Sequence, residues 1–152
     1  MSSLIDDYLA LETLLIDRLT DQVPALDEAL SAADLDGITD AQVNTPSAHV
    51  IYLGDLVPEG AKFNSGCSQI VDQRWLVWVV VRNLRTTITG ADNRADAGPL
   101  LVTINAALQG WKASPEFGEL KRITPPAVRY RNGNGYFPLA YKARITSRGV
   151  TP

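Results

Sequence analysis

The run Trp75-Leu76-Val77-Trp78-Val79-Val80-Val81 is the most strongly patterned stretch of the sequence. Its β-branched and aromatic residues are those that fit the pleated surface of a sheet. Successive side chains of a strand point to opposite faces, and here both alternating sets are apolar. The wider segment 68–83 therefore predicts a central strand that is covered on both faces. Because the chain has only 152 residues, a neighbouring subunit could cover the second face of this strand.

Before this strand, residues 3–20 predict an amphipathic helix. Apolar residues recur there at three-to-four spacing, namely at Leu4, Tyr8, Leu11, Leu15 and Leu19. Ser3 followed by Asp6 resembles a capping box, and the early acids suit the positive end of a helix dipole. Pro24 limits continuation of the helix.

The segment between this helix and the central strand contains a second, shorter strand. Residues 48–53 form a β-rich run that predicts a buried strand ended by Gly54 and Asp55. The stretch 25–45 is open to two interpretations, a short helix over 25–33 or a weak edge strand over 23–30.

After the central strand, the pattern predicts a loop, a second helix and a hairpin. Residues 58–66 contain proline, glycine, asparagine and serine, which indicates a loop or the tip of a hairpin, and residues 86–97 are polar and rich in glycine, aspartate and asparagine, which indicates a loop. Pro99 suits the start of a helix and Gly110 its end. Apolar residues between them form a stripe at Leu100, Ile104, Leu108 and Trp111.

The remaining sequence predicts short strands at 120–123 and 127–130 and a longer one at 136–145. The Asn132-Gly133-Asn134-Gly135 turn before the last run predicts a β-hairpin. Pro138 indicates an edge position or a bulge. We therefore expect one α+β domain over residues 1–152, with an antiparallel or mixed sheet and two main helices packed on it.

Composition places the chain among soluble globular proteins. Hydrophobic residues make up 45% and charged residues 20% of the sequence. The longest apolar run has seven residues, against the roughly 18 that a transmembrane helix needs. The N-terminal residues lack the pattern of a secretory signal, and the lone Cys67 suits a reducing cytoplasm.

Charge is unevenly distributed along the chain, although the net charge is only −3. Residues 1–40 contain ten acidic groups and one arginine, whereas residues 112–152 contain eight basic groups and two acidic ones. The basic residues lack a reading helix or an aromatic platform, which argues against sequence-specific nucleic-acid binding. Acidic and basic surfaces could instead meet between identical subunits or stacked rings. Two solvated faces are the simpler interpretation.

The sequence carries no strong enzymatic signature. His49 is the only histidine and Cys67 the only thiol, and they provide half of a tetrahedral zinc set. No glycine-rich segment has the spacing of a phosphate-binding or dinucleotide-binding loop. The three tryptophans suit a core or an interface better than a ligand site. We expect no catalytic residue, metal or cofactor.

In order and spacing, the chain resembles the tail terminators of long-tailed phages of the Mu-like group, which share a small α+β fold with the tail terminator of phage lambda. The resemblance extends from the first helix to the last strand. It rests on the leucine-rich helix 4–19, the Pro46–Tyr52 segment, Gln69 with the run 75–83, Gly98-Pro99-Leu100-Leu101, Ala107-Leu108-Gln109-Gly110-Trp111 and Gly135-Tyr136-Phe137-Pro138-Leu139.

This resemblance implies a structural virion protein that forms a ring, expected to be a hexamer, on the last ring of tail-tube subunits. The ring would stop tube growth at the head-proximal end of the tail and offer a surface to neck or head-completion proteins. Assembly in the host cytoplasm is implied, and genome DNA would pass through the ring.

Candidate contact residues come from the sequence itself. The two predicted loops supply Asn64, Asp92, Asn93 and Arg94 as candidates for subunit, tube or neck contacts. Arg82 and Arg85 beside the long strand are candidates for pairing with an acidic first-helix face on a neighbour. Ordinary exposed loops and charges are the alternative interpretation.

Three other functions compete with this hypothesis. The first is a different neck or head–tail joining protein, and the second is a tube subunit. Tube subunits generally need long hairpins to stack, and the sequence predicts one good hairpin. The third is a small-ligand binding domain that uses the tryptophans.

Overall fold

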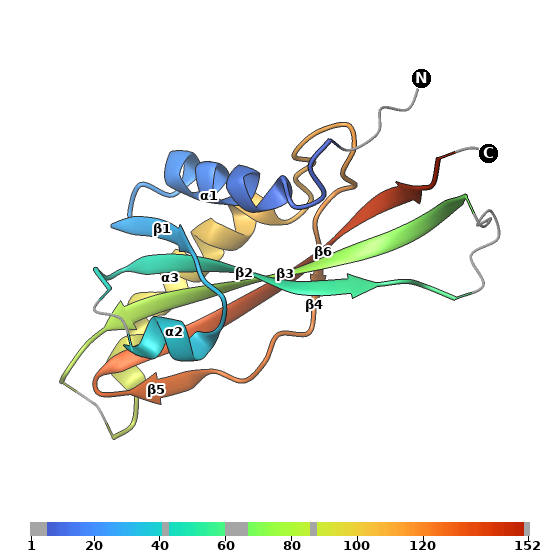
Figure 1. The fold of residues 1–152 in the computed structure, drawn as a ribbon. Helices are drawn as coiled ribbons and strands as arrows, with labels where there is room; N and C mark the ends of the chain where they lie inside the picture. Colours follow the sequence, from blue (N-terminus) through green and yellow to red (C-terminus); the bar gives the residue numbers. More distant parts are fainter. Residues whose placement is uncertain (1–5, 41–42, 60–66, 86–87, 151–152) are drawn as a thin grey trace.

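The computed structural model describes residues 6–40, 43–59, 67–85 and 88–150. Three helices and six strands alternate along these segments (Figure 1). In chain order they are α1 Leu11–Gln22, β1 Glu28–Ser31, α2 Leu35–Asp40, β2 Ser47–Leu56, β3 Ser68–Arg82, α3 Ala91–Leu108, β4 Lys121–Ile123, β5 Arg129–Arg131 and β6 Asn134–Arg148.

The antiparallel pair of β3 and β6 is the axis of the molecule. Each strand has 15 residues, and their register is unbroken from Ser68 opposite Arg148 to Arg82 opposite Asn134. We name this pair the ribbon. Figure 1 shows it as two long, twisted arrows that extend past α1 on the right-hand side. The predicted central strand at 68–83 is confirmed.

The sheet has the order β1-β2-β3-β6-β4, and β5 pairs with another part of β6. β1 is parallel to β2, whereas the other pairs are antiparallel, so the sheet is mixed. β1 therefore lies at one edge, and the short strands β4 and β5 share the other. The expected α+β fold is confirmed, with two main helices and the additional short helix α2.

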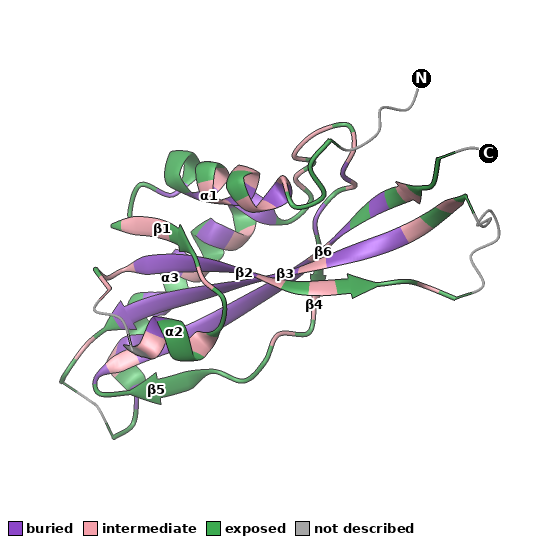
Figure 2. Cartoon of the chain, in the orientation of Figure 1, coloured by how far each residue is buried: buried purple, intermediate pink, exposed green. Residues whose placement is uncertain are grey.

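The two faces of β3 pack into two separate clusters. Trp75, Val77 and Val79 belong to the larger cluster, which contains residues of α1 and α3. Trp78 and Val80 belong to a smaller cluster that includes Ile38 of α2. Figure 2 shows the buried interior along the middle of the sheet. The second face is therefore covered here by the chain's own α2, where we had allowed for a neighbouring subunit.

Helix α1 begins later than its leucine pattern predicts. Its first residue is Leu11, and the backbone N of Leu9 donates to Oδ1 of Asp7 at 3.0 Å. This local turn competes with helical hydrogen bonding. Ser3 lies outside the described residues, and no side chain caps α1 in the structure. The predicted limit before Pro24 is confirmed, because α1 ends at Gln22.

Helix α3 begins eight residues before Pro99, so the loop predicted over 86–97 is wrong from Ala91 onward. Pro99 lies inside the helix. The buried stripe continues backward from Leu100 through Ala97 to Asn93. These small and polar residues hide the helical pattern in the sequence. Gly110 follows the helix with a positive φ of 80°, as its predicted role requires.

Residues 25–45 contain both an edge strand and a helix. β1 at Glu28–Ser31 confirms the edge-strand interpretation, and the alternative helix over 25–33 is wrong. The six-residue helix α2 was not predicted. β2 continues past Gly54 to Leu56, because Gly54, with a φ of 95°, forms an irregularity in the pairing with β3.

The predicted hairpin before the last strand is confirmed. Asn132 and Gly133 join β5 to β6 with φ values of 52° and 84°, as a type I′ turn requires. Pro138 pairs with Trp78 of β3 on one side. On its other side, it falls in the interval between the β6 residues that pair with β5 and those that pair with β4. Its missing N–H is thus tolerated within a long inner strand.

Candidate functional site

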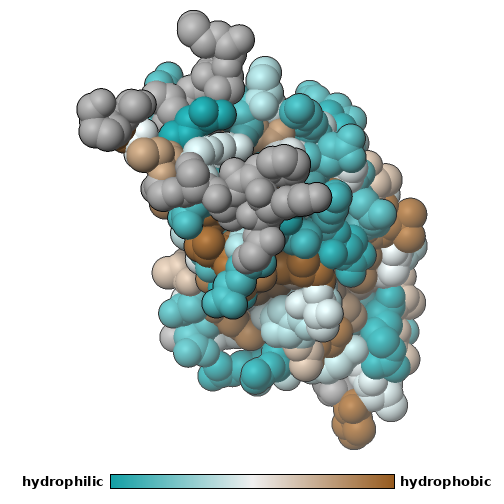
Figure 3. Space-filling model, turned by 90° about the vertical axis from the view of Figure 1, so that its right-hand side faces the viewer, coloured by the Kyte–Doolittle hydropathy of each residue, from teal (hydrophilic) through white to brown (hydrophobic). Residues whose placement is uncertain are grey.

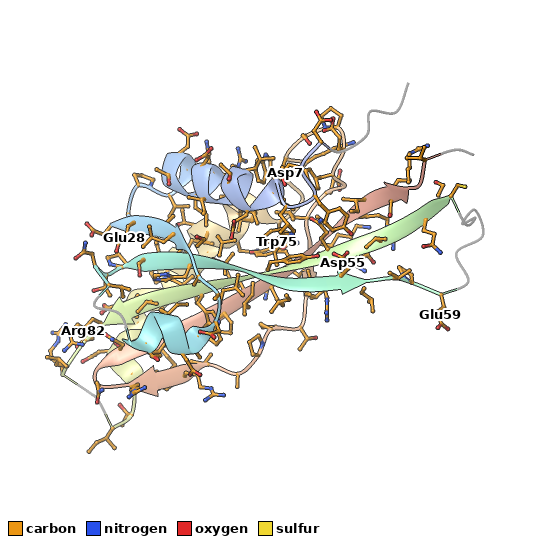
Figure 4. All side chains as sticks on the ribbon, viewed as in Figure 1. Asp7, Glu28, Asp55, Glu59, Trp75 and Arg82 are labelled. Atoms are coloured by element: carbon orange, nitrogen blue, oxygen red, sulfur yellow. The ribbon has the colours of Figure 1, made fainter. Side chains whose placement is uncertain are left out.

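Five of the six predicted contact residues lie at one end of the ribbon. They are Arg82, Arg85, Asp92, Asn93 and Arg94, at the end of β3, in the following segment and in the first turn of α3. The β5–β6 turn closes the same end, where Figure 4 marks Arg82. We name residues 82–85, 88–94 and 132–134 the turn end. The sixth candidate, Asn64, lies outside the described residues.

Arg82 holds the β5–β6 turn against β3. Its Nη1 donates to the carbonyl oxygen of Asn132 and to Oδ1 of Asn134, both at 3.1 Å. The backbone N of Asn83 donates to the carbonyl oxygen of Gly133 at 2.9 Å. Arg82 therefore has an intrachain structural role, which its position beside a strand did not reveal.

Arg85 is more available to another molecule. Its Nε lies 3.8 Å from Oδ2 of Asp92, and its side chain is 81% exposed. A pair this long and exposed contributes little to stability. Arg94 is engaged more closely, because its Nη1 donates to the carbonyl oxygen of Thr89 at 2.9 Å and to the hydroxyl of Tyr130 at 3.1 Å.

Asn93 packs α3 against β6. It is only 2% exposed, so the expectation of an exposed loop residue is wrong. A Cβ added to Gly135 would lie 3.0 Å from Cβ of Asn93, which shows how closely the two backbones approach. Oδ1 of Asn93 has no hydrogen-bond partner among the described residues.

Two hollows open at the turn end. One of about 390 Å³ lies between the start of β2 and α3 and is lined by Ala25, Thr45, Pro46, Val81, Arg82, Asp96, Pro99, Leu100 and Thr103. The other, of about 460 Å³, lies over the β5–β6 turn. Leu84 and Ile88 are 62% and 99% exposed nearby. Exposed apolar side chains among charged ones are typical of a surface that contacts other proteins.

The opposite end of the ribbon is held by polar side chains. The hydroxyl groups of Tyr8 and Tyr52 both donate to the carboxylate of Asp55. Nε2 of Gln73 donates to the carbonyl oxygen of Tyr8 at 2.6 Å. Burial, helped by the hydrogen bond to Asp55, raises the pKa of Tyr8 to about 12. We name residues 52–59, 67–74 and 142–150 the hairpin end; Figure 3 views the molecule from this side, where hydrophobic residues lie between hydrophilic ones.

A buried carboxylate lies in the ribbon near the hairpin end. Asp72 of β3 is 2% exposed and accepts hydrogen bonds from Nε and Nη2 of Arg144 at 2.9 and 3.2 Å. Nζ of Lys142 lies 3.8 Å from the same carboxylate. The hydrogen bond from Arg144 lowers the pKa of Asp72. Asp72 and Arg144 are direct partners in the register, so this ion pair favours the observed alignment of the strands.

The geometry excludes joint chemistry by His49 and Cys67. His49 of β2 lies opposite Trp78, whereas Cys67 directly precedes Ser68 at the start of β3. Ten residues of strand separate Ser68 from Trp78, a distance of about 33 Å. His49 is 3% exposed, with Nε2 2.9 Å from Oγ of the fully buried Ser47, and burial lowers its pKa. The imidazole of His49 thus bonds to a buried hydroxyl of its own strand and has no contact with Cys67.

The tryptophans do not form a shared ligand site. Trp75 and Trp78 belong to clusters on opposite faces of the sheet. Within the core, Nε1 of Trp75 donates a hydrogen bond to Oε1 of Gln73 at 3.3 Å. Trp111 lies beneath the guanidinium of Arg18, whose carbon is 5.0 Å from the ring centre. Core packing, the preferred interpretation, is confirmed for Trp75 and Trp78.

In the described parts of the chain, no three His, Cys, Asp or Glu residues come together as a metal site. Among the described helices, none is long and apolar enough to cross a membrane.

The sequence is similar to those of a known protein family. The model of the family described as "Phage tail terminator protein" matches residues 5–151. No individual curated protein matches the sequence. Because the family match spans almost the whole chain, the protein belongs to the phage tail terminator family and is a structural, non-enzymatic component of the phage virion tail.

Proposed function

We propose that the protein forms a closed ring on the head-proximal end of the tail tube. There it stops the addition of tube subunits and presents an attachment surface to neck or head-completion proteins. The observation that carries this proposal is the family match over residues 5–151, which gives the chain a structural role in the tail. The ring, expected to be a hexamer, leaves a central passage for genome DNA.

The fold has four distinct surfaces, which is the number that a ring subunit between the tube and the neck needs. A ring subunit needs two different, complementary surfaces for its two neighbours. It also needs one surface for the tube and one for the neck. The chain has two unlike ends along the ribbon and two unlike edges across the sheet. We assign the edges to neighbouring subunits and the ends to the tube and the neck.

A tube subunit and a joining protein are the nearest rivals. The small number of predicted hairpins had argued against a tube subunit, and that argument was wrong. β2 and β3 pair antiparallel from Ser47 opposite Val80 to Leu56 opposite Asp72, and so form a second, long hairpin. The terminator proposal therefore rests on the family match and not on the hairpins.

Tube polymerisation tests the proposal directly. Tubes would be grown from the tail-tube protein of the same phage, with and without the purified terminator. We expect gold-labelled terminator at one end of each tube, arrested growth and a ring in averaged end-on images. Label along the whole tube would indicate a tube subunit. Binding to the neck protein without any effect on tube length would indicate a joining protein.

A further inference from the structure

One edge of the sheet is acidic. β1 forms this edge, and the surrounding segment 21–40 contains six acidic residues and no lysine or arginine. They are Asp21, Asp27, Glu28, Asp34, Asp36 and Asp40. Asp27, Asp34 and Asp36 are exposed, and Glu28 is half-buried.

The other edge of the sheet is basic. β4 and β5 form it, and the segment 121–131 contains four basic residues and no acidic one. These residues, Lys121, Arg122, Arg129 and Arg131, are all exposed. Figure 1 shows β1 and β5 on opposite sides of the sheet. With four strand-to-strand steps between them, the two edges lie about 19 Å apart.

Both edges keep backbone groups available for a further strand. Among the described residues, β1 pairs only with β2, and β5 pairs only with β6. Following the pairings across the sheet, β1 and β5 run in opposite directions. In two copies placed side by side in the same orientation, β1 of one copy would therefore lie antiparallel to β5 of the next.

The carboxylates of the acidic edge bond to backbone groups but not to basic side chains among the described residues: Oδ1 of Asp34 accepts from the backbone N of Gly37, and Oε1 of Glu28 accepts from that of Asn44. In the part of the chain that the structure describes, no ion pair engages Asp27, Asp34, Arg129 or Arg131. Each edge also exposes an apolar side chain, Leu30 in β1 at 41% and Tyr130 in β5 at 42%. Complementary charge with an apolar contact between the charges is what a specific protein interface requires.

We infer that the seam between neighbouring copies joins the acidic edge of one chain to the basic edge of the next. This inference rests on the proposed ring. The contact is heterologous, so it closes into a ring when the rotation between successive copies is a whole fraction of a full turn. It also accounts for the charge asymmetry along the sequence, and the partner is a second copy of this chain.

Charge exchange tests the seam. The basic-edge variant carries Arg129→Glu and Arg131→Glu, and the acidic-edge variant carries Asp27→Lys and Asp36→Lys. Each variant alone presents two edges of like charge, so we expect its ring yield on tube ends to fall at least about tenfold. An equimolar mixture should restore rings, because acidic edges of one variant then meet basic edges of the other in alternation.

Matched controls separate the seam from general charge effects. Lys112→Glu reverses one basic charge and Asp6→Lys with Asp17→Lys reverses two acidic charges, all at exposed positions that belong to neither edge of the sheet and to neither end of the ribbon. We expect these controls to form rings as the wild type does. Thermal unfolding of every variant would verify that it is folded.

A crosslink provides a second measurement that does not depend on charge. In a Cys67→Ser background, which removes the exposed native thiol, Glu28→Cys and Arg131→Cys place one thiol on each edge. Oxidation of assembled rings should give a ladder of covalent oligomers. Either single-cysteine chain should stop at dimers or below.

The outcomes distinguish this inference from the proposed function. If wild-type rings form and both single-edge variants form them equally well, the seam is wrong and the terminator proposal stands. Wild-type rings without rescue in the mixture, or without a crosslinked ladder, would also overturn the seam. A wild type that forms no ring at tube ends would overturn both.

Discussion

The two halves of the ribbon are stabilised in different ways. Under the helices, residues 75–82 of β3 and 134–141 of β6 bury apolar side chains on both faces. Toward the hairpin end, residues 68–74 and 142–148 of the same strands contain the Asp72–Arg144 ion pair. Apolar burial is nearly independent of pH, whereas ion pairs respond to pH and salt. We name the first part the covered half and the second part the hairpin half. Changes in pH or salt are therefore expected to alter the stability of the hairpin half more than that of the covered half.

This difference suits the proposed function. A ring subunit needs a rigid centre that carries its edges and an end that can adjust to another protein. Exposed apolar residues also accumulate on the distal part of β2, where Leu53, Leu56 and Val57 are 40%, 53% and 49% exposed. We expect local opening to begin at the hairpin half, since it has fewer buried apolar contacts.

The largest effect is expected in the covered half, from Trp75→Ala. Trp75 is fully buried, and its removal should lower the free energy of unfolding by about 3–5 kcal/mol. Urea unfolding at pH 7 measures this. Leu56→Ala in β2, opposite Asp72 of the hairpin half, is the control, with an expected loss of at most about 0.5 kcal/mol, because Leu56 is exposed. Similar losses for the two variants would show that the halves do not differ as described.

A smaller effect is expected in the hairpin half, from Asp72→Asn. Since Arg144 is half-exposed, the loss at pH 7 should be only about 2 kcal/mol. The pKa of Asp72 is lowered in the folded protein. Its contribution is therefore present above the unfolded pKa of about 3.9 and is lost as the pH falls through the folded pKa.

The pH dependence is the decisive readout for Asp72→Asn. Urea unfolding of wild type and variant at a series of pH values should show the stability difference shrinking below about pH 4. High salt should also reduce it. A difference that stays constant with pH would assign the effect to packing and remove the distinction between the halves.

Gly133→Ala tests the turn that closes the covered half. Gly133 has a φ of 84°, a conformation that costs a residue with a side chain roughly 1–2 kcal/mol. The added Cβ would also lie 2.2 Å from Cδ2 of Leu84, the end of a flexible side chain that can move. We expect a loss of about 1 kcal/mol, measured by urea unfolding. Gly98→Ala, with nothing near its added Cβ and a site inside α3, should be neutral or stabilising.

The sequence predicted the covered half far better than the segments around it. Residues 68–83 combine apolar character on both faces with β-branched residues, and few other structures suit that pattern. The Asn132-Gly133 turn was equally informative. A type I′ turn requires a positive φ at both central residues, and asparagine and glycine are the residues that adopt it most readily. Features that depend on one local pattern were thus predictable.

The starts of the helices and the contact surfaces were not predictable from the sequence, because they depend on tertiary packing. The first turns of α3 are held by buried Asn93 and Ala97, and neither is a large apolar residue that would mark the buried stripe in the sequence. The leucine pattern likewise placed the start of α1 too early, since the turn at Asp7 interrupts it. The opposite charges of the two sheet edges were visible in the sequence only as an asymmetry, because strand order decides which charges share an edge.

The smallest effect is expected from Tyr8→Phe, which removes one hydrogen bond at the hairpin end. Tyr8 is 42% exposed, so the loss at pH 7 should be about 0.5 kcal/mol. The raised pKa, about 12, means that the neutral hydroxyl stabilises the folded protein below about pH 10 and ceases to do so as the pH rises through about 12. Ultraviolet titration of wild type and variant isolates this ionisation in their difference.

Asp55→Asn then separates the two causes of that shift. Burial is the larger cause and the bond to Asp55 adds to it, so the substitution should lower the pKa of Tyr8 only part of the way toward its ordinary value near 10. A complete return would mean that the carboxylate alone holds Tyr8, and that the N-terminal segment does not pack on the ribbon. An intermediate pKa would mean that burial of the Tyr8 ring and its hydrogen bond to Asp55 both contribute to the contact at the hairpin end.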